Sequence, residues 1–282
     1  MKLQVVHRTQ YTYASSVTES FNEVRLQPIS QDGQDCQSFI LKILPASRLS
    51  HYFDFYQNYV HFFEVLGPHT LLSIESISRV TTSHNPLAED AGKISLSQLA
   101  QCSQMDKCYD FMQPSQYVAL SPEVWRLALD ATAGETDAWQ AAHAIMRYIH
   151  ENFAYVPRST TVNTTVEEVI QLRRGVCQDF THLMLGMCRS LKMPARYVSG
   201  YLYNGPGETL EGSQASHAWC EVFLPEFGWR GLDPTNNQPA NEHYVKVAVG
   251  RDYADIVPVK GSYKGPREKA MSVHVEVSRL ET

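Results

Sequence analysis

A cysteine, a histidine and an aspartate have the residue types that thiol chemistry requires, and their order along the chain makes that chemistry physically feasible. Cys177 follows Gly175 and precedes Phe180, which begins an apolar stripe with helical spacing. This spacing predicts that Cys177 lies in the first turn of a helix, on the side that faces the rest of the domain. The helix dipole and the unpaired backbone N–H groups stabilise negative charge at that end, so the position favours a reactive thiolate.

A thiolate nucleophile also needs a base and a group that orients the base. Strands are expected over residues 216–224 and 229–233, joined by a short turn. In such a hairpin His217 lies roughly opposite the residues just past Asp233, within reach of a carboxylate–imidazole hydrogen bond. The order Cys, His, Asp is therefore compatible with a catalytic triad.

The elements that must position these residues are readable in the second half of the chain. The helix that carries Cys177 is predicted from apolar residues at i, i+3, i+4, i+7, i+8 and i+11, and Pro194 ends it. Two earlier helices start at Ser121-Pro122 and at Thr136-Asp137, where capping residues stand. A strand over residues 196–203 precedes the hairpin.

The chain divides into a β-rich part, a connector and a mixed domain. Residues 1–85 contain alternating and β-branched runs separated by turns, which predicts an all-β, sandwich-like domain. Small and polar residues over 86–115 indicate a connector with one short helix, and residues 116–282 form the second domain. Alternation over 271–278 predicts a half-buried strand whose sheet is not assigned. The fold class is α+β.

Composition and charge exclude several classes of protein. The 282 residues carry a formal net charge of -6, with Lys and Arg scattered singly, so nucleic acid is not an expected partner. The first residues lack a secretory apolar region, and no run approaches the length of a membrane helix, which together favour a cytoplasmic protein without membrane contact. Six cysteines at irregular spacing indicate free thiols rather than a disulfide framework.

Four motifs in order carry a family resemblance: RGVCQDFTH at 174–182, PARYVSGY at 194–201, HAWCEV at 217–222 and GWRGLDPT at 228–235. They closely resemble the core of the bacterial transglutaminase-like superfamily, whose members are often described as cysteine proteases. The β-rich segment resembles that family's N-terminal domain. The resemblance covers about residues 136–237 and implies a papain-like core, with the cysteine at a helix start beside an antiparallel sheet. It implies Cys177 as nucleophile, His217 as base and Asp233 as the residue that orients the base.

The sequence leaves the oxyanion partner open. Gln171 stands six residues before Cys177, which is the papain-like spacing, while Gln178 and the Cys177 backbone N–H compete with it. Trp219 is predicted on the same strand face as His217, where it either walls the site or only packs.

Two polar residues of the same helix have structural interpretations. Asp179 is expected to cap the helix or to fix a neighbour, and His182 to be buried and hydrogen-bonded. Cys177, His182 and Cys188 point in different directions or lie too far apart along the helix to share one zinc ion. No metal and no cofactor are therefore expected.

Together the residues and the resemblance imply a thiol peptidase, amidase or transglutaminase-like acyltransferase. It would act on an amide bond of a polypeptide or small amide through a Cys177 thioester, where water gives hydrolysis and an amine gives transfer. The alternative is a catalytically silent protein of the same fold that binds a polypeptide, and the presence of all three residues argues against it. A redox protein is disfavoured because no Cys-x-x-Cys pair exists. The substrate, the acceptor, the oligomeric state and the role of the first 85 residues stay open.

Overall fold

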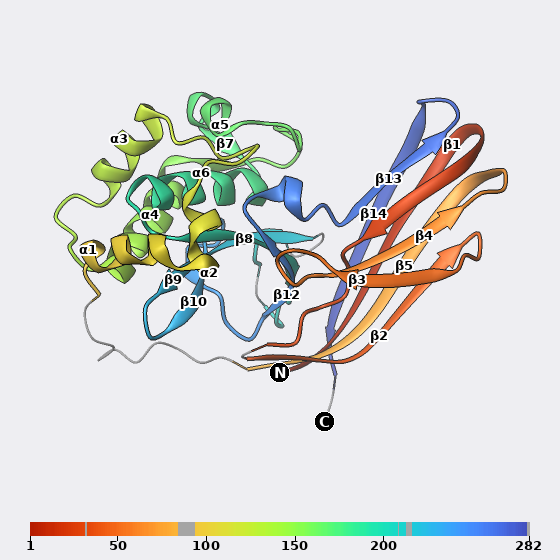
Figure 1. Ribbon diagram of the computed structural model, residues 1–282, viewed down its shortest axis with the longest axis horizontal. Helices are drawn as coiled ribbons and strands as arrows, with labels where there is room; N and C mark the ends of the chain where they lie inside the picture. The colour runs from red at the N-terminus through yellow and green to blue at the C-terminus, as the bar shows by residue number, and fades with distance from the viewer. Residues whose placement is uncertain (32, 84–93, 208, 213–215, 281–282) are drawn as a thin grey trace.

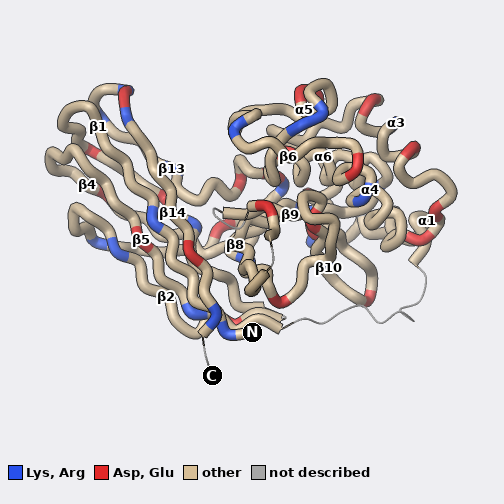
Figure 2. The backbone as a smooth tube through the Cα atoms, turned by 180° about the vertical axis from the view of Figure 1, so that it is seen from behind, with Lys and Arg blue, Asp and Glu red and all other residues tan. Residues whose placement is uncertain are grey.

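The computed structural model describes the chain except for residues 32, 84–93, 208, 213–215 and 281–282. A β-sheet domain and a mixed core that carries the helices lie side by side (Figure 1). Figure 2 shows acidic and basic residues interspersed along the backbone of both parts. Among the described residues no helix is long and apolar enough to cross a membrane.

The β-sheet domain is organised by one long strand. The first half of β1 (Lys2–Val24) pairs with β5 and β14, and its second half pairs with β4 and β13. Alternating residues of β1 are buried, which gives the sheet an inner and an outer face. The predicted all-β domain is confirmed, and its described strands form one sheet, to which β1 contributes along its whole length, around a small apolar core. The other strands are β2 (Gln34–Leu44), β3 (Leu49–Phe53), β4 (Tyr59–Val65), β5 (His69–Thr82), β13 (Val259–Lys264) and β14 (Lys269–Arg279).

The C-terminal segment corrects the predicted domain limits. The sequence predicts residues 116–282 as the second domain, yet β13 and β14 return to the first one and pair with β1, with Glu23 opposite Lys260 and Val5 opposite Val277. Alternation in a sequence tells which face of a strand is buried, but it does not identify the neighbouring strand. The β-sheet domain is therefore built from both ends of the chain.

The core places one buried helix against an antiparallel sheet. α6 (Cys177–Ser190) lies on β8 and β9, and every residue from Asp179 to Arg189 is buried. Around α6 pack three further helices, α3 (Pro122–Ala131), α4 (Ala138–Asn152) and α5 (Val166–Leu172). The sheet order is β11-β10-β9-β8-β12, with strands β8 (Ala195–Leu202), β9 (His217–Leu224), β10 (Gly228–Asp233), β11 (Gln238–Pro239) and β12 (Tyr244–Gly250). Two residues each of β6 (Ala154–Tyr155) and β7 (Arg174–Gly175) form a small parallel pair.

The predicted helix starts are confirmed by their caps. The Ser121 side chain accepts a hydrogen bond from the Val124 N–H, and the Asp137 carboxylate accepts one from the Gln140 N–H. The connector contains more helix than predicted: α1 (Leu96–Leu99), α2 (Asp106–Tyr109) and two 3₁₀ turns, Ala100–Gln104 and Asp110–Met112. A third 3₁₀ turn, Tyr253–Asp255, follows β12. Residues 86–93 of the predicted connector lie outside the described residues.

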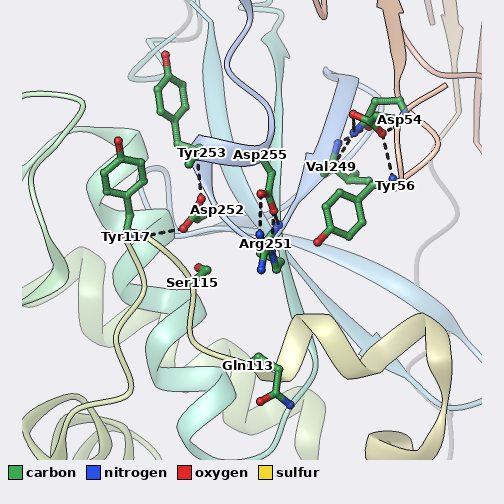
Figure 3. A network of polar contacts seen from close by, with 12 residues as sticks. Asp54, Tyr56, Gln113, Ser115, Tyr117, Val249, Arg251, Asp252, Tyr253 and Asp255 are labelled. Carbon is green, nitrogen blue, oxygen red and sulfur yellow. Dashed lines mark hydrogen bonds and ion pairs between the residues drawn. The ribbon is translucent and has the colours of Figure 1, made fainter. Parts of the chain in front are cut away.

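A buried amide joins the two parts of the molecule. Asn58 is fully buried in the turn before β4, and its side chain both donates to the Val249 carbonyl and accepts from the Val249 N–H, each at 2.8 Å. Figure 3 shows Val249 of β12 next to Asp54 and Tyr56 of the β-sheet domain. The Asp54 carboxylate accepts from the Asn58 side chain at 3.0 Å, so the amide is held in one orientation.

Replacement of Asn58 by alanine is expected to lower the free energy of unfolding by about 2–4 kcal/mol, because it leaves the Val249 N–H and carbonyl buried without partners. Chemical denaturation measures the loss. The matched control is Asn152→Ala at the exposed end of α4, with an expected change below about 0.5 kcal/mol. Equal losses in the two variants would contradict the anchoring role of Asn58.

Candidate active site

The entry to α6 is fixed by a buried carboxylate next to the thiol. Cys177 is the first residue of α6 and is half-buried. Asp179 accepts hydrogen bonds from the Val176 N–H at 2.8 Å and from the Thr160 hydroxyl at 2.6 Å. Burial raises the pKa of Asp179, and these two donors partly oppose that rise. The predicted structural role of Asp179 as a capping residue is thus confirmed.

Gly175 makes this entry possible. A Cβ atom at Gly175 would come within 2.8 Å of the Asp179 side chain. A larger residue there would displace the carboxylate that holds the Val176 N–H, and the start of α6 would move with it. The backbone N–H groups of the first turn of α6 have no carbonyl within their own helix to donate to. They lie beside Cys177 and can stabilise negative charge there.

His217 and Asp233 meet where β9 begins and β10 ends. In the hairpin Leu232 lies opposite Cys220. Continued along the two strands, this register places His217 opposite the residues just past Asp233, as predicted. The His217 Nε2 donates to Asp233 Oδ2 at 2.8 Å, and both side chains are fully buried. Within the described part of the chain Nδ1 has no hydrogen-bond partner. This arrangement fixes the ring orientation of His217.

The electrostatics of His217 are set by its two neighbours. Burial disfavours the charged ring, but the Asp233 carboxylate and the Cys177 side chain outweigh burial and raise the pKa of His217 to about 10. The ring is therefore an imidazolium at neutral pH. Positive charge beside a cysteine at a helix N-terminus is the environment in which protein thiols become nucleophiles.

Asp233 is held by more donors than the histidine alone. Oδ2 also accepts from the Asn236 side chain and from the Tyr244 hydroxyl, both at 2.8 Å. Oδ1 accepts from the backbone N–H groups of Thr235 at 2.9 Å and Asn236 at 3.3 Å. Burial alone would raise the pKa of Asp233, but His217 and these donors outweigh burial and lower it. The carboxylate is therefore ionised and fixed in position.

Trp219 packs behind the histidine. It is 1% exposed, and its ring stacks on His217 with a centroid distance of 6.2 Å and an interplanar angle of 27°. Gly200 leaves room for the indole, because a Cβ atom there would come within 2.6 Å of it. Trp219 and His217 thus share one face of β9, as the alternation predicted.

Gly212 approaches the histidine from the segment between β8 and β9. Its φ is +85°, and a Cβ atom there would lie 2.4 Å from His217 Nδ1. Both the backbone conformation and the available space therefore require glycine at this position.

The two glutamine candidates occupy different environments. Gln178 is half-buried, and its side-chain amide donates to the Val162 carbonyl at 3.0 Å, which ties the segment before α5 to the start of α6. Gln171 lies near the end of α5 with an exposed side chain. Their roles in binding an oxyanion stay predictions.

His182 is buried in the core and contacts Tyr253 and Tyr117. Its Nε2 accepts a hydrogen bond from the Tyr253 N–H at 3.2 Å, and its ring stacks on Tyr117 with centroids 5.5 Å apart. Burial lowers the pKa of His182 to about 3, so the ring is neutral. The expectation of a buried, hydrogen-bonded histidine is confirmed. Figure 3 shows the Tyr117 N–H next to the Asp252 carboxylate, to which it donates at 2.8 Å.

Asn236 and Tyr244 are the site residues that sequence reasoning missed. The Asn236 amide accepts from the Glu211 N–H at 2.9 Å and donates to the Glu211 carbonyl at 3.2 Å while it also donates to Asp233. The one signal for Asn236 in the sequence is its position three residues after Asp233. A chain that turns directly after a strand brings such a residue back to the carboxylate at the end of that strand. Tyr244 comes from β12, eleven residues away, and has no comparable signal.

Asn236→Ala is expected to lower the rate of acylation of Cys177 by about tenfold. The reason is that Asp233 loses a hydrogen bond that contributes roughly 1.4 kcal/mol. The rate is measured by the release of p-nitrophenol from p-nitrophenyl acetate. Asn152→Ala makes the same change at an exposed site and should retain the full rate. An Asn236→Ala rate equal to that of this control would show that Asn236 does not position Asp233.

Comparison with known proteins decides the family. Residues 126–234 match the family model of the transglutaminase-like superfamily, and residues 3–81 match that of the bacterial transglutaminase-like N-terminal region. The chain belongs to the transglutaminase-like superfamily. Cys177, His217 and Asp233 all fall within the matched core.

Some relatives of this transglutaminase-like protein match its whole length, and others match only a part of it. An uncharacterized protein of Mycobacterium leprae is 36% identical over 99% of both chains. The protein-glutamine gamma-glutamyltransferase of Pseudomonas aeruginosa is 35% identical over 33% of this chain and 15% of its own length. A crystal structure described as a "putative cysteine protease" from Cytophaga hutchinsonii has a TM-score of 0.80 at 24% identity, covering 100% of this chain and 91% of that one. The last match shows that the whole fold is shared.

Proposed function

We propose that this protein is a thiol enzyme that cleaves an amide bond of a polypeptide or small amide through a thioester on Cys177. One observation carries the proposal: the half-buried Cys177 at the start of α6 lies next to the buried His217 imidazolium, whose Nε2 donates to the ionised Asp233 carboxylate at 2.8 Å. A structural cysteine needs neither the charge nor the aspartate.

In the first half of the reaction the Cys177 thiolate attacks the carbonyl carbon of the amide. The carbonyl oxygen gains negative charge beside the N–H groups at the start of α6, which favours the tetrahedral intermediate. The His217 imidazolium gives a proton to the leaving nitrogen, the C–N bond breaks, and the amine departs. The acyl group is then a thioester on Cys177, and His217 is neutral.

In the second half neutral His217 takes a proton from the acceptor. Water as acceptor gives a carboxylic acid, and an amine gives a new amide. The C–S bond breaks, which restores the thiolate and the imidazolium. Asp233 stays ionised throughout and holds the ring through Nε2. The same residues therefore serve hydrolysis and transfer, and access of the acceptor decides between them.

Trapping the thioester tests this proposal. The protein is incubated with p-nitrophenyl acetate and digested, and the acetylated peptide is identified by mass spectrometry. Acetylation of Cys177 is expected, and faster loss of the acetyl group on addition of methylamine would identify a transferase, whereas loss unaffected by methylamine would identify a hydrolase. Cys36, the other half-exposed cysteine, provides the matched control Cys36→Ala, which should be acetylated normally. Acetylation confined to other residues would overturn the proposal.

A further inference from the structure

A cavity lies between the core sheet and the β-sheet domain. Its volume is about 420 Å³. Gln34 and Ser83 line it from the β-sheet domain, and Glu221, Arg230 and Lys246 line it from the core. Along β9, Glu221 points away from the face that packs on α6, because its neighbours in sequence belong to the apolar core shared with that helix.

The walls of this cavity are fixed by hydrogen bonds between the two domains. The Gln34 side chain accepts from the Lys246 N–H and donates to the Lys246 carbonyl, both at 2.7 Å. The Thr82 hydroxyl donates to the Glu242 carbonyl at 2.6 Å. The cavity is therefore preformed in the folded chain, which lowers the ordering cost for a ligand that enters it.

The cavity carries positive charge in excess. Glu221 is buried, and it pairs with Arg196 at 2.7 Å and with Lys246. Burial opposes its ionisation, but these two cations bring the pKa of Glu221 to about 2. Arg230 lines the same cavity, so its lining carries two cations, Arg230 and Lys246, against the one carboxylate of Glu221. Burial lowers the pKa of Lys246, and Glu221 opposes that change while Arg196 and Arg230 add to it.

Arg230 retains hydrogen-bonding capacity toward a ligand. One guanidinium nitrogen donates to the Trp229 carbonyl at 3.1 Å, and Nε has no partner within the described part of the chain. An arginine fork matches the two oxygens of a carboxylate. The half-buried indole of Trp229 also lines the cavity and offers apolar surface to a short carbon chain. An organic acid satisfies both features, whereas a bare inorganic anion satisfies only the charge.

We propose that this cavity binds a small organic carboxylate through Arg230 and Lys246. The site is distinct from the acyl site. Trp219 stacks on His217 and lines the cavity, and Tyr244 lines the cavity and donates to Asp233, so these two side chains form the wall between the two sites. Binding of the carboxylate does not need a reactive Cys177.

Nuclear magnetic resonance of the full chain labelled with ¹⁵N tests the proposal, with succinate as the probe. The indole N–H signal of Trp219, identified by its loss in Trp219→Phe, is expected to shift saturably with succinate and to stay unchanged with the neutral analogue succinamide. Arg230→Gln should weaken the affinity by about tenfold and Arg230→Glu should abolish binding. Arg126→Gln, which makes the first change on an exposed face of α3, should bind as the wild type does.

A further measurement separates the cavity from the proposed acyl site. Protein alkylated at Cys177 should bind succinate with unchanged affinity, which separates this proposal from the proposed enzyme activity. Loss of binding after alkylation would place succinate in the acyl site and overturn the inference. Absence of a saturable shift, undiminished affinity in both Arg230 variants, or phosphate binding as tight as that of succinate would also overturn it.

Discussion

Replacement of Cys177 by alanine is expected to abolish formation of the acyl-enzyme and to lower amide turnover by about 10⁵-fold or more, because no bond to the acyl carbon can form. Alanine favours a helix, and the half-buried thiol contributes little packing at the first residue of α6. The thermal midpoint and the circular dichroism spectrum should therefore match those of the wild type. Turnover and acetylation by p-nitrophenyl acetate are measured side by side.

The control for this variant is Cys36→Ala, since Cys36 is the other cysteine that is half-exposed and the remaining four are buried. It should keep the wild-type rate. Full activity of Cys177→Ala with an intact fold would remove the proposed thioester from the mechanism. Loss of activity in both variants would point instead to a general effect of thiol removal.

His217→Ala is expected to lower the acylation rate by about 10³-fold, since the leaving group loses its proton donor and Cys177 loses the adjacent positive charge. The exposed histidine of β14 provides a matched control, His274→Ala, which should keep the wild-type rate. Stopped-flow release of p-nitrophenol measures the rates. A loss below tenfold would show that His217 is not the base.

The raised pKa of His217 gives this variant a second signature. In the folded wild type the imidazolium persists until the pH approaches about 10, whereas in the unfolded chain the ring loses its proton near 6.5. The stability contributed by the charged ring is therefore complete below about 6.5 and is lost as the pH rises through about 10. The wild type should lose more stability across this interval than His217→Ala, as chemical denaturation at several pH values would measure.

The parts of the site that the sequence predicts are those set by short-range geometry. The apolar spacing after Gly175 places Cys177 at a helix start, and the short turn between β9 and β10 fixes the register that brings His217 to Asp233. The caps at Ser121 and Asp137 likewise depend on neighbours a few residues away.

Features that depend on distant segments were not predictable in this way. Tyr244 reaches Asp233 because β12 pairs with β8, and β14 joins the first domain because it pairs with β1. A strand's alternation shows which side is buried and leaves its neighbour unspecified. The cavity around Arg230 and Lys246 also arises only when the two domains meet.

The most direct test of the central claim measures how fast iodoacetamide alkylates Cys177 from about pH 4 to about pH 9, because alkylation reports the thiolate and needs no substrate. Mass spectrometry locates the label in the wild type and in His217→Ala. We predict rapid labelling of Cys177, selective over the other half-exposed cysteine Cys36, and clearly slower labelling of Cys177 in His217→Ala. Slow labelling of Cys177 with the pH dependence of an ordinary thiol, identical in both proteins, would contradict the account.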